Sequence, residues 1–298
     1  MTVTTMQESK SAAGGVWVAA LIFLPPALLL FTVFVILPIG EAAWYSFYNW
    51  DGYNRPQNFI GLKNYISLLN NSNFRIAALN NLIIIAVSLA IQLPLALAMA
   101  LLLAKRAFGA VAFRLIFFLP YILADVAAGL IFRFIFDGDY GPLSGATQAL
   151  GFGPVYMLAS PTWAMVALLV VIVWKYFGFH MMLFIAGLQG IDKNLYEAAE
   201  IDGAGAFQRF RFVTIPQLSP MIKLSVFFAV IGALQFFDVV VPLTGGGPFN
   251  ATNTMVSYLY LFGITRMRVG FGSAVGVVLF IICVGFAFGY RRLLMRDE

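Results

Sequence analysis

The sequence predicts an all-α polytopic membrane protein that crosses the bilayer six times. Of its 298 residues, 61% are hydrophobic and only 10% are charged, and the mean hydropathy is +0.90. Soluble domains carry roughly 25% charged residues, so the composition favours a membrane protein. No low-complexity tract or long linker divides the chain. We therefore expect one transmembrane domain at residues 16–294, with cytoplasmic tails at 1–15 and 295–298.

Six apolar runs are each close to the length of about 20 residues that a helix needs to span a bilayer. The first run is longer than the core of a signal peptide and lacks a small-residue cleavage site, which predicts a retained anchor. An aromatic segment from Trp44 to Trp50 follows it and suits a membrane interface. The last run carries Gly272 and Gly276, whose spacing is typical of closely packed membrane helices. The predicted spans lie at about 16–39, 82–104, 115–136, 163–188, 221–243 and 271–293.

The distribution of basic residues predicts the orientation. Six spans put both termini on one side, and eleven of the 18 Lys and Arg residues then fall on that side, against five in the opposite loops. Loops rich in Lys and Arg normally face the cytoplasm. We therefore expect cytoplasmic termini and a cytoplasmic location for the polar segment at 194–220, in a bacterial inner membrane. This asymmetry also explains the net charge of +5, so nucleic-acid binding is not indicated.

Several classes of chemistry have no support in the sequence. One Cys and one His exclude a disulfide framework and a His/Cys metal cluster supplied by this chain. Cys283 lies in an apolar run and is expected to be a small core residue. Neither H-E-x-x-H nor G-x-S-x-G occurs, and no motif points to a Ser–Lys or carboxylate mechanism. We expect no enzyme activity and no cofactor or metal in this chain.

The polar segment at 194–220 carries strong helix start and stop signals. Asn194 is expected to cap a short helix, with Glu197 three residues later in a variant of the capping box. Gly203 and Gly205 are expected to end this helix, because glycine readily adopts the left-handed conformation of a helix exit. A second short helix is expected to follow and to end where Pro216 breaks it.

Small residues in the first of these helices predict a contact surface. Ala198, Ala199 and Gly203 allow another backbone to approach closely, which a loop needing only solubility would not require. A solvated loop between two membrane helices is the alternative. We interpret the segment as a docking surface for a cytoplasmic partner.

The same segment resembles the cytoplasmic motif of binding-protein-dependent ABC importer permeases, which is Glu-Ala-Ala, three residues, Gly, nine residues and then Ile-x-Leu-Pro. Val213-Thr214-Ile215-Pro216 stands at the ending with two mild departures. The resemblance implies a type I importer permease fold, whose coupling helix seats in a cleft of an ATPase subunit and directs Glu197 at a basic residue. A second Glu-Ala-Ala at 41–43 lacks the glycine and the proline, and we interpret it as coincidence. The implied coupling residues are Glu197, Ala198, Ala199, Asp202, Gly203, Ala204 and Pro216.

Charged residues inside the predicted spans mark a second candidate site. Asp125 lies near the middle of the third span, where an ionised carboxylate costs roughly 2.5–3.5 kcal/mol. Tyr121 is one helical turn earlier, so we expect both on one face. Lys175 lies at a similar depth in the fourth span, and a structural Asp125–Lys175 ion pair is one interpretation. The other is a translocation pathway lined by these residues with Tyr176 and His180, although a lone His is more often a packing residue.

The fifth span carries Gln235 and Asp238 near its outer end and is followed by Thr244-Gly245-Gly246-Gly247-Pro248. Three glycines and a proline predict a helix stop and a tight outer turn, and no P-loop Lys follows. This turn and Leu119-Pro120-Tyr121 resemble sugar-type importer permeases, which implies that Asp125 and Asp238 line a sugar site with Tyr121, near His180. The expected pathway residues are Tyr121, Asp125, Lys175, Tyr176, His180, Gln235 and Asp238.

The resemblance implies a permease subunit that moves a sugar or glycoside, delivered by an extracytoplasmic binding protein, across the inner membrane. The implied partners are a second homologous permease subunit, two ATPase subunits that hold ATP and Mg²⁺, the binding protein and the lipid bilayer. An anionic glycoside is an alternative substrate, because Lys175, His180 and Arg133 suit a phosphate or sulfonate. An ion-gradient-driven secondary transporter with Asp125 as a relay is the rival, but it leaves the Glu-Ala-Ala segment unexplained.

Overall fold

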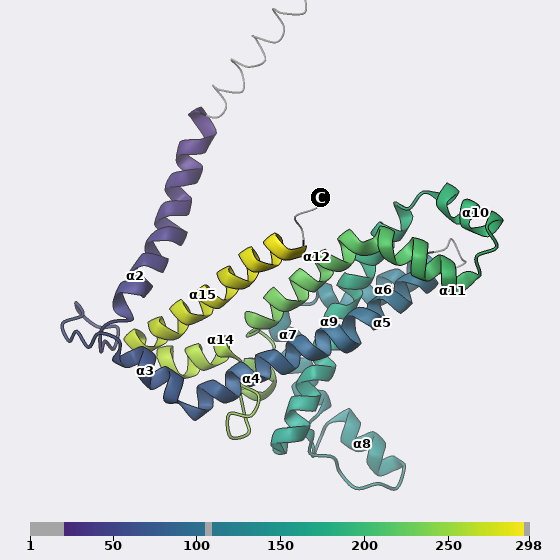
Figure 1. Cartoon of the computed structure of the whole chain (residues 1–298). Coiled ribbons are helices and arrows are strands. Elements are labelled where there is room, and N and C mark those ends of the chain that lie inside the picture. Colours follow the sequence, from purple (N-terminus) through teal and green to yellow (C-terminus); the bar gives the residue numbers. More distant parts are fainter. Residues whose placement is uncertain (1–20, 105–108, 295–298) are drawn as a thin grey trace, which may run out of the picture.

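The computed structural model describes residues 21–104 and 109–294, which form helices joined by loops (Figure 1). Within these residues the one β-type pairing is an isolated bridge between Tyr48 and Phe59. The helices are α2 (Leu37–Tyr45), α3 (Lys63–Asn70), α4 (Ser72–Val87), α5 (Leu93–Leu103), α6 (Ala110–Ile122), α7 (Asp125–Ile135), α8 (Pro142–Ala149), α9 (Pro161–Gln189), α10 (Lys193–Ile201), α11 (Ala206–Arg209), α12 (Ile215–Leu234), α13 (Val240–Thr244), α14 (Met255–Tyr258) and α15 (Val269–Leu294).

The expected all-α architecture is confirmed in this part of the chain, with five membrane-length helices and a sixth candidate span. Five continuous helices are long and apolar enough to span a bilayer, and α6 with α7 makes a sixth span that is bent by 97°. The five helices are Leu21–Tyr45, Ser72–Leu103, Pro161–Gln189, Ala206–Leu234 and Val269–Leu294. They run past the predicted limits at several ends, because polar turns at their ends are also helical.

The prediction of one continuous third span at 115–136 is wrong. Leu123 and Ala124 are extended, with ψ values of 141° and 136°, and they separate α6 from α7. The carbonyl oxygens of Pro120 and Leu123 accept hydrogen bonds from the Lys175 ammonium instead. The break is therefore stabilised by a side chain of another helix, which no local pattern in the third span could indicate.

Prolines inside the long helices do not break them. Pro216 was expected to end a helix, but the helix runs without interruption from Ala206 to Leu234. A proline clashes with the carbonyl four residues before it and lacks an N–H, and a wider π-helical turn gives that carbonyl room. Pro38, Pro94 and Pro216 each lie two residues after such a turn, at Thr32–Ile36, Ser88–Gln92 and Phe210–Thr214 respectively.

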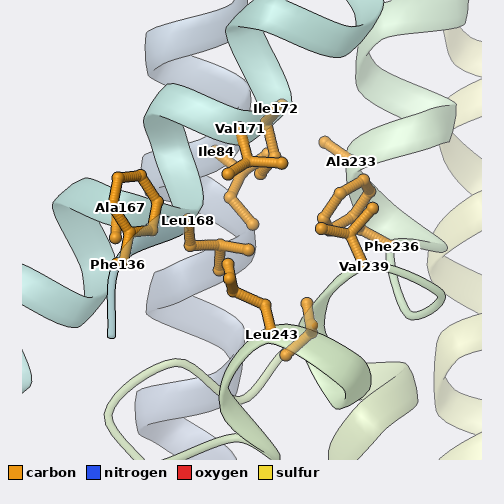
Figure 2. Packing of buried hydrophobic residues seen from close by; sticks show 11 residues of the cluster. Ile84, Phe136, Ala167, Leu168, Val171, Ile172, Ala233, Phe236, Val239 and Leu243 are labelled. Atoms are coloured by element: carbon orange, nitrogen blue, oxygen red, sulfur yellow. The ribbon is translucent and has the colours of Figure 1, made fainter. Parts of the chain in front are cut away.

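The long helix α9 is the centre of the bundle. Over half of its most apolar stretch (56%) is buried, more than in any other membrane-length helix of the described chain. It contributes Leu168 and Val171 to one apolar cluster, shared with α4, α12 and α13 (Figure 2). It contributes Met181 and Phe184 to another, shared with α5. At Gly178 a Cβ would collide with the carbonyl of Phe117, so glycine permits the close approach of α6.

The first helix, Leu21–Tyr45, projects away from this bundle (Figure 1). Its most apolar stretch has no buried residue. Its C-terminal end is fixed by α15, because Gly270 donates a hydrogen bond to the carbonyl of Trp50 (2.9 Å) and packs on the backbone of Tyr45 and Tyr48. The predicted start of this span at 16 lies outside the described residues.

The connecting segments define two ends of the bundle (Figure 1). Helix α8 precedes α9 and helix α10 follows it, so the two lie at opposite ends of a 29-residue helix. The C-terminal half of α15 lies beside the part of α12 nearest to α10, where the Tyr290 hydroxyl donates to the carbonyl of Lys223 (2.7 Å). The α10 segment and the described C-terminal end of the chain therefore lie at the same end.

Candidate functional site

A cavity of about 410 Å³ lies between α6, α9, α12 and the junction of α4 with the π-helical turn Ser88–Gln92. Of the residues that were predicted to line a pathway, Tyr121, Tyr176 and His180 border this cavity. Lys175 and Asp125 form a pair beside it, and Gln235 and Asp238 are also outside its lining. The lining consists of Ile84, Ser88, Gln92, Tyr121, Ile172, Tyr176, Phe179, His180, Phe228, Ala229, Gly232, Ala233 and Phe236.

Aromatic rings form most of one cavity wall. Tyr121 of α6 stacks on Phe179 of α9 with ring centroids 4.8 Å apart, and it meets Tyr176 edge-on at 6.2 Å. Phe179 continues the contact to Phe228 of α12 at 5.8 Å, and Tyr176 contacts Phe236 at 5.9 Å. A continuous aromatic surface with hydroxyl groups is suited to binding the apolar face of a ring-shaped ligand.

An ion pair holds the bend of the third span against α9. The Lys175 ammonium lies 2.9 Å from Asp125 Oδ1, and the Tyr176 hydroxyl donates to the same oxygen at 3.0 Å. Lys175 is 1% exposed, whereas Asp125 is 34% exposed. The ion-pair interpretation of the sequence is therefore found in the structure. Tyr121 and Asp125 do not share a helical face as expected, because the break at Leu123 separates them.

The fifth span ends earlier than predicted. Helix α12 stops at Leu234, with Gln235 at its C-cap, and Asp238 lies in the loop before α13. Both side chains are exposed. The predicted limit at residue 243 is wrong, because the chain turns after Gln235 and re-enters helix only at Val240.

The glycine-rich turn is a compact structure that closes α13. Gly245 has a φ of +62° and Gly246 a φ of +82°, which is the left-handed conformation expected of a helix stop. The Thr244 hydroxyl hydrogen-bonds the Thr252 hydroxyl at 2.7 Å. Gly246 packs so closely on Asn253 that a Cβ would collide with its amide. The following Gly247–Pro248 peptide bond is cis.

A buried polar network behind this turn was missed by the sequence prediction. Asn81 of α4 donates to the carbonyl of Ala233 and accepts from the Met255 backbone N–H at 2.8 Å. Asn80 donates to the carbonyls of Ala251 and Asn253, both at 2.8 Å. Together the two amides tie α4 to the end of α12 and to the start of α14. Two adjacent Asn residues before an apolar run were the available signal.

The α10–α11 elbow, residues 193–209, contains the two short helices expected in the segment 194–220, but the capping residue and the role of Gly205 differ from the prediction. Asp192, not Asn194, caps α10, because its carboxylate accepts from the Asn194 backbone N–H at 2.9 Å. Gly203 has a φ of +80° and ends the helix as predicted. Gly205 is extended and begins α11, where its N–H donates to the Gln208 side chain at 2.8 Å.

The elbow is tied to the bundle on one side and exposed on the other. The Tyr196 hydroxyl hydrogen-bonds the Thr214 hydroxyl at 3.0 Å, and Arg209 pairs with Glu200 at 3.0 Å. Glu197 and Ala198 are exposed, and Glu197 has no ion-pair partner in the described chain. Ile201 is 87% exposed. The expected coupling residues Ala199 and Ala204 are half-buried, while Asp202, Gly203 and Pro216 are exposed.

At the opposite end, residues 137–161 form a second exposed structure that contains α8. Ser144 is buried and its hydroxyl donates to the carbonyl of Gly138 at 2.6 Å. The Tyr156 hydroxyl donates to Asp139 at 2.8 Å, and this hydrogen bond to a carboxylate raises the pKa of the Tyr156 phenol. Tyr140, Leu150 and Phe152 are exposed around it. Residues 137–161 are therefore a folded element and not an irregular connection.

The described residues contain no group of three or more His, Cys, Asp or Glu that could hold a metal ion. They form a cavity within the helix bundle and an exposed elbow at one end of it.

The sequence of this chain matches the family described as "Binding-protein-dependent transport system inner membrane component" over residues 92–296. The chain therefore belongs to this family of ABC importer permease subunits, which are multi-pass proteins of the inner membrane. Hydrolysis of ATP in such importers is carried out by separate ATPase subunits, so the chain is a transport subunit and not an enzyme.

Two relatives match almost the whole chain. One is the sulfoquinovosyl glycerol transport system permease protein SmoG of Agrobacterium fabrum, 33% identical, with 94% of this chain and 91% of the relative covered. Another is the trehalose/maltose transport system permease protein MalF of Thermococcus litoralis, 32% identical, with 90% of each covered. A solved bacterial alginate ABC transporter, in complex with a periplasmic protein bound to an alginate pentasaccharide, has a chain with the same fold, at a TM-score of 0.80 and 20% identity over 93% of each chain.

Proposed function

We propose that this chain is the permease subunit of an ATP-driven importer for a sugar or glycoside. The main support for this substrate class is the composition of the cavity, where stacked aromatic rings adjoin amide, hydroxyl and imidazole groups. Sugars present both an apolar ring face and a rim of hydroxyls, so they need this combination. The relatives named for sulfoquinovosyl glycerol and for trehalose and maltose support the same class.

The remaining partners follow from the family. A second homologous permease subunit completes the membrane domain, two ATPase subunits bind ATP and Mg²⁺, and an extracytoplasmic binding protein delivers the substrate. The exposed α10–α11 elbow supports the ATPase contact, because the small residues Ala198 and Gly203 are exposed near Glu197, which has no ion-pair partner in the described chain. In this arrangement Glu197 faces a basic residue of the ATPase, and closure of the ATPase pair pulls the elbow with it.

The orientation that suits this role has both termini in the cytoplasm. The predicted bias of Lys and Arg supports it, and so does the position of the elbow at the same end as the described C-terminal residues. Residues 137–161 and the turn at 244–248 then face the outside. The pathway residues are Tyr121, Asp125, Lys175, Tyr176, His180, Gln235 and Asp238, with the turn at 244–248 as the outer gate.

Uptake by the reconstituted importer tests this function. The complete importer, with its second permease, ATPases and binding protein, is placed in liposomes with ATP inside and a panel of labelled glycosides outside. We expect glycoside uptake that needs ATP and the binding protein and that persists when ionophores remove ion gradients. Uptake that follows an ion gradient and continues without the ATPases would support the secondary-transporter alternative instead.

A further inference from the structure

The cavity contains no charged side chain. None of its lining residues is Asp, Glu, Lys or Arg. The nearest cation that could serve an anionic ligand is Lys175, but its ammonium already contacts Asp125 at 2.9 Å and the carbonyls of Pro120 and Leu123 at 3.2 and 2.6 Å. Arg133 is exposed on α7 and is not part of the lining. The charges near the cavity are thus already paired or lie elsewhere.

Three neutral polar side chains of the cavity, Ser88, Gln92 and His180, are buried and only partly satisfied. Gln92 and Ser88 are 2% and 3% exposed, and they share one long contact, 3.4 Å from the Ser88 hydroxyl to the Gln92 carbonyl oxygen. His180 lines the cavity and is 3% exposed, and its imidazole makes no hydrogen bond in the described structure. Buried polar groups normally have partners. An unpaired imidazole nitrogen at a cavity wall therefore points to a ligand that supplies one.

The position of Gln92 has a structural cause. Ser88 and Gln92 are the first and last residues of the π-helical turn that precedes Pro94. Such turns occur often at functional sites, and this one carries two polar side chains, four residues apart, among apolar neighbours. The turn and α9 both contribute to the cavity lining, so hydrogen-bonding groups are present on two elements around the same space.

We propose that this cavity selects an uncharged, polyhydroxylated ligand and that Gln92 and His180 are the hydrogen-bonding residues that read its hydroxyl groups. The inference rests on the proposed sugar-transport function and narrows its substrate class. A sulfonate or phosphate here would be buried without a countercharge, which is strongly unfavourable. Hydroxyl groups can instead pair with the Gln92 amide and with the His180 imidazole, while the sugar ring stacks on Tyr121 or Phe179.

A matched pair of glycosides tests the inference. Glucosyl glycerol and sulfoquinovosyl glycerol differ only in the group at C6, which is a hydroxyl in the first and a sulfonate in the second. Their binding to the detergent-solubilised complex of the two permease subunits and the ATPases, prepared without the binding protein, is measured by saturation-transfer NMR titration. We expect glucosyl glycerol to bind at least about tenfold more tightly. Equal or tighter binding of the sulfonate overturns the inference and leaves sugar transport standing.

Substitutions then test the two named residues. We expect Gln92→Leu and His180→Phe each to weaken glucosyl glycerol binding by about tenfold, while Gln217→Leu, the same exchange at an exposed residue of α12, leaves it unchanged. Importer that contains Gln92→Lys should gain affinity for the sulfonate. Size-exclusion chromatography confirms assembly of each variant. If Gln92→Leu and His180→Phe both leave glucosyl glycerol binding unchanged in assembled importer, these two residues do not hydrogen-bond the ligand. If neither glycoside binds, nor maltose or trehalose, the sugar-transport proposal fails together with this inference.

Discussion

The Lys175 ammonium of α9 lies 2.9 Å from the Asp125 carboxylate at the first residue of α7. The same ammonium donates to the carbonyls of Pro120 and Leu123, which the bend of the third span leaves without helical partners. The buried Lys175 ammonium therefore contacts the chain on both sides of the 97° bend. Since Tyr176 also donates to Asp125 and borders the cavity, the bend and the cavity share a hydrogen-bond network.

Removal of the carboxylate should destabilise the protein. Asp125→Ala leaves Lys175 buried without a countercharge, so we expect a loss of about 3–5 kcal/mol in the free energy of unfolding. The Asp125→Ala/Lys175→Met double variant should be less destabilised than the sum of the single variants, because it removes the unpaired charge. Denaturant unfolding of the purified chain in detergent measures all three. Additive losses would show that the two residues do not interact, and a stable Asp125→Ala that fails only in uptake would favour the pathway role.

The all-α membrane architecture could be predicted because it depends on the lengths of the apolar runs and on the distribution of Lys and Arg, and both can be read directly from the sequence. The prediction failed where a distant residue decides the local structure. The break at Leu123 depends on Lys175, more than 50 residues away in the sequence. The pairing of Asn81 with Met255 likewise joins residues that are far apart in the sequence, so it depends on how the chain folds between them. The end of α12 at Leu234 was missed because Phe236, Val239 and Val240 continue the apolar pattern past it, and these three side chains are buried although the chain leaves the helix.

Only part of the candidate site could be predicted, because only some of its residues stand out from their local sequence. Tyr121, Tyr176 and His180 stood out as polar residues in apolar runs, and they border the cavity. Ser88 and Gln92 were overlooked, although they are polar residues four apart in the second span. Their burial in the cavity depends on the π-helical turn before Pro94, and a regular helical wheel does not describe that turn.

Asn81 should be needed for stability. Asn81→Leu leaves the buried Met255 N–H without a partner and leaves the carbonyl of Ala233 with the long hydrogen bond from the Phe236 N–H (3.4 Å). Each unpaired buried group costs about 1–3 kcal/mol, so we expect a clear drop in the melting temperature of the purified chain. Asn70→Leu, the same change at an exposed residue, is the control. An unchanged melting temperature for Asn81→Leu would mean that this network contributes little to the fold.

The two glycines of the elbow should respond differently to alanine. Gly203 has a φ of +80°, a left-handed conformation that costs a non-glycine residue roughly 1–2 kcal/mol. Gly205 is extended at φ −69°, which alanine adopts freely. Neither Cβ would meet an atom closer than 3.8 Å, so backbone conformation alone separates the two sites. We expect faster amide hydrogen exchange in α10 for Gly203→Ala only, and equal exchange in both variants would contradict this account.

Glu197 should be needed for coupling to the ATPase. It is exposed on α10 without an ion-pair partner in the described chain, so its carboxylate is available to a basic residue of a partner. In reconstituted importer, Glu197→Lys should abolish most of the substrate-stimulated ATPase activity and uptake, because it sets two cations against each other.

The second Glu-Ala-Ala supplies the control for this substitution. Glu41 is exposed and begins the same tripeptide, but it lies in α2, near the contact of that helix with α15 at the end of the bundle opposite the elbow. Glu41→Lys should therefore leave stimulation and uptake near the unsubstituted level. Equal losses in both variants would indicate a general effect of added positive charge. Normal coupled transport by Glu197→Lys would instead place the ATPase contact on another part of the chain, since a reversed charge at the centre of that contact cannot be neutral.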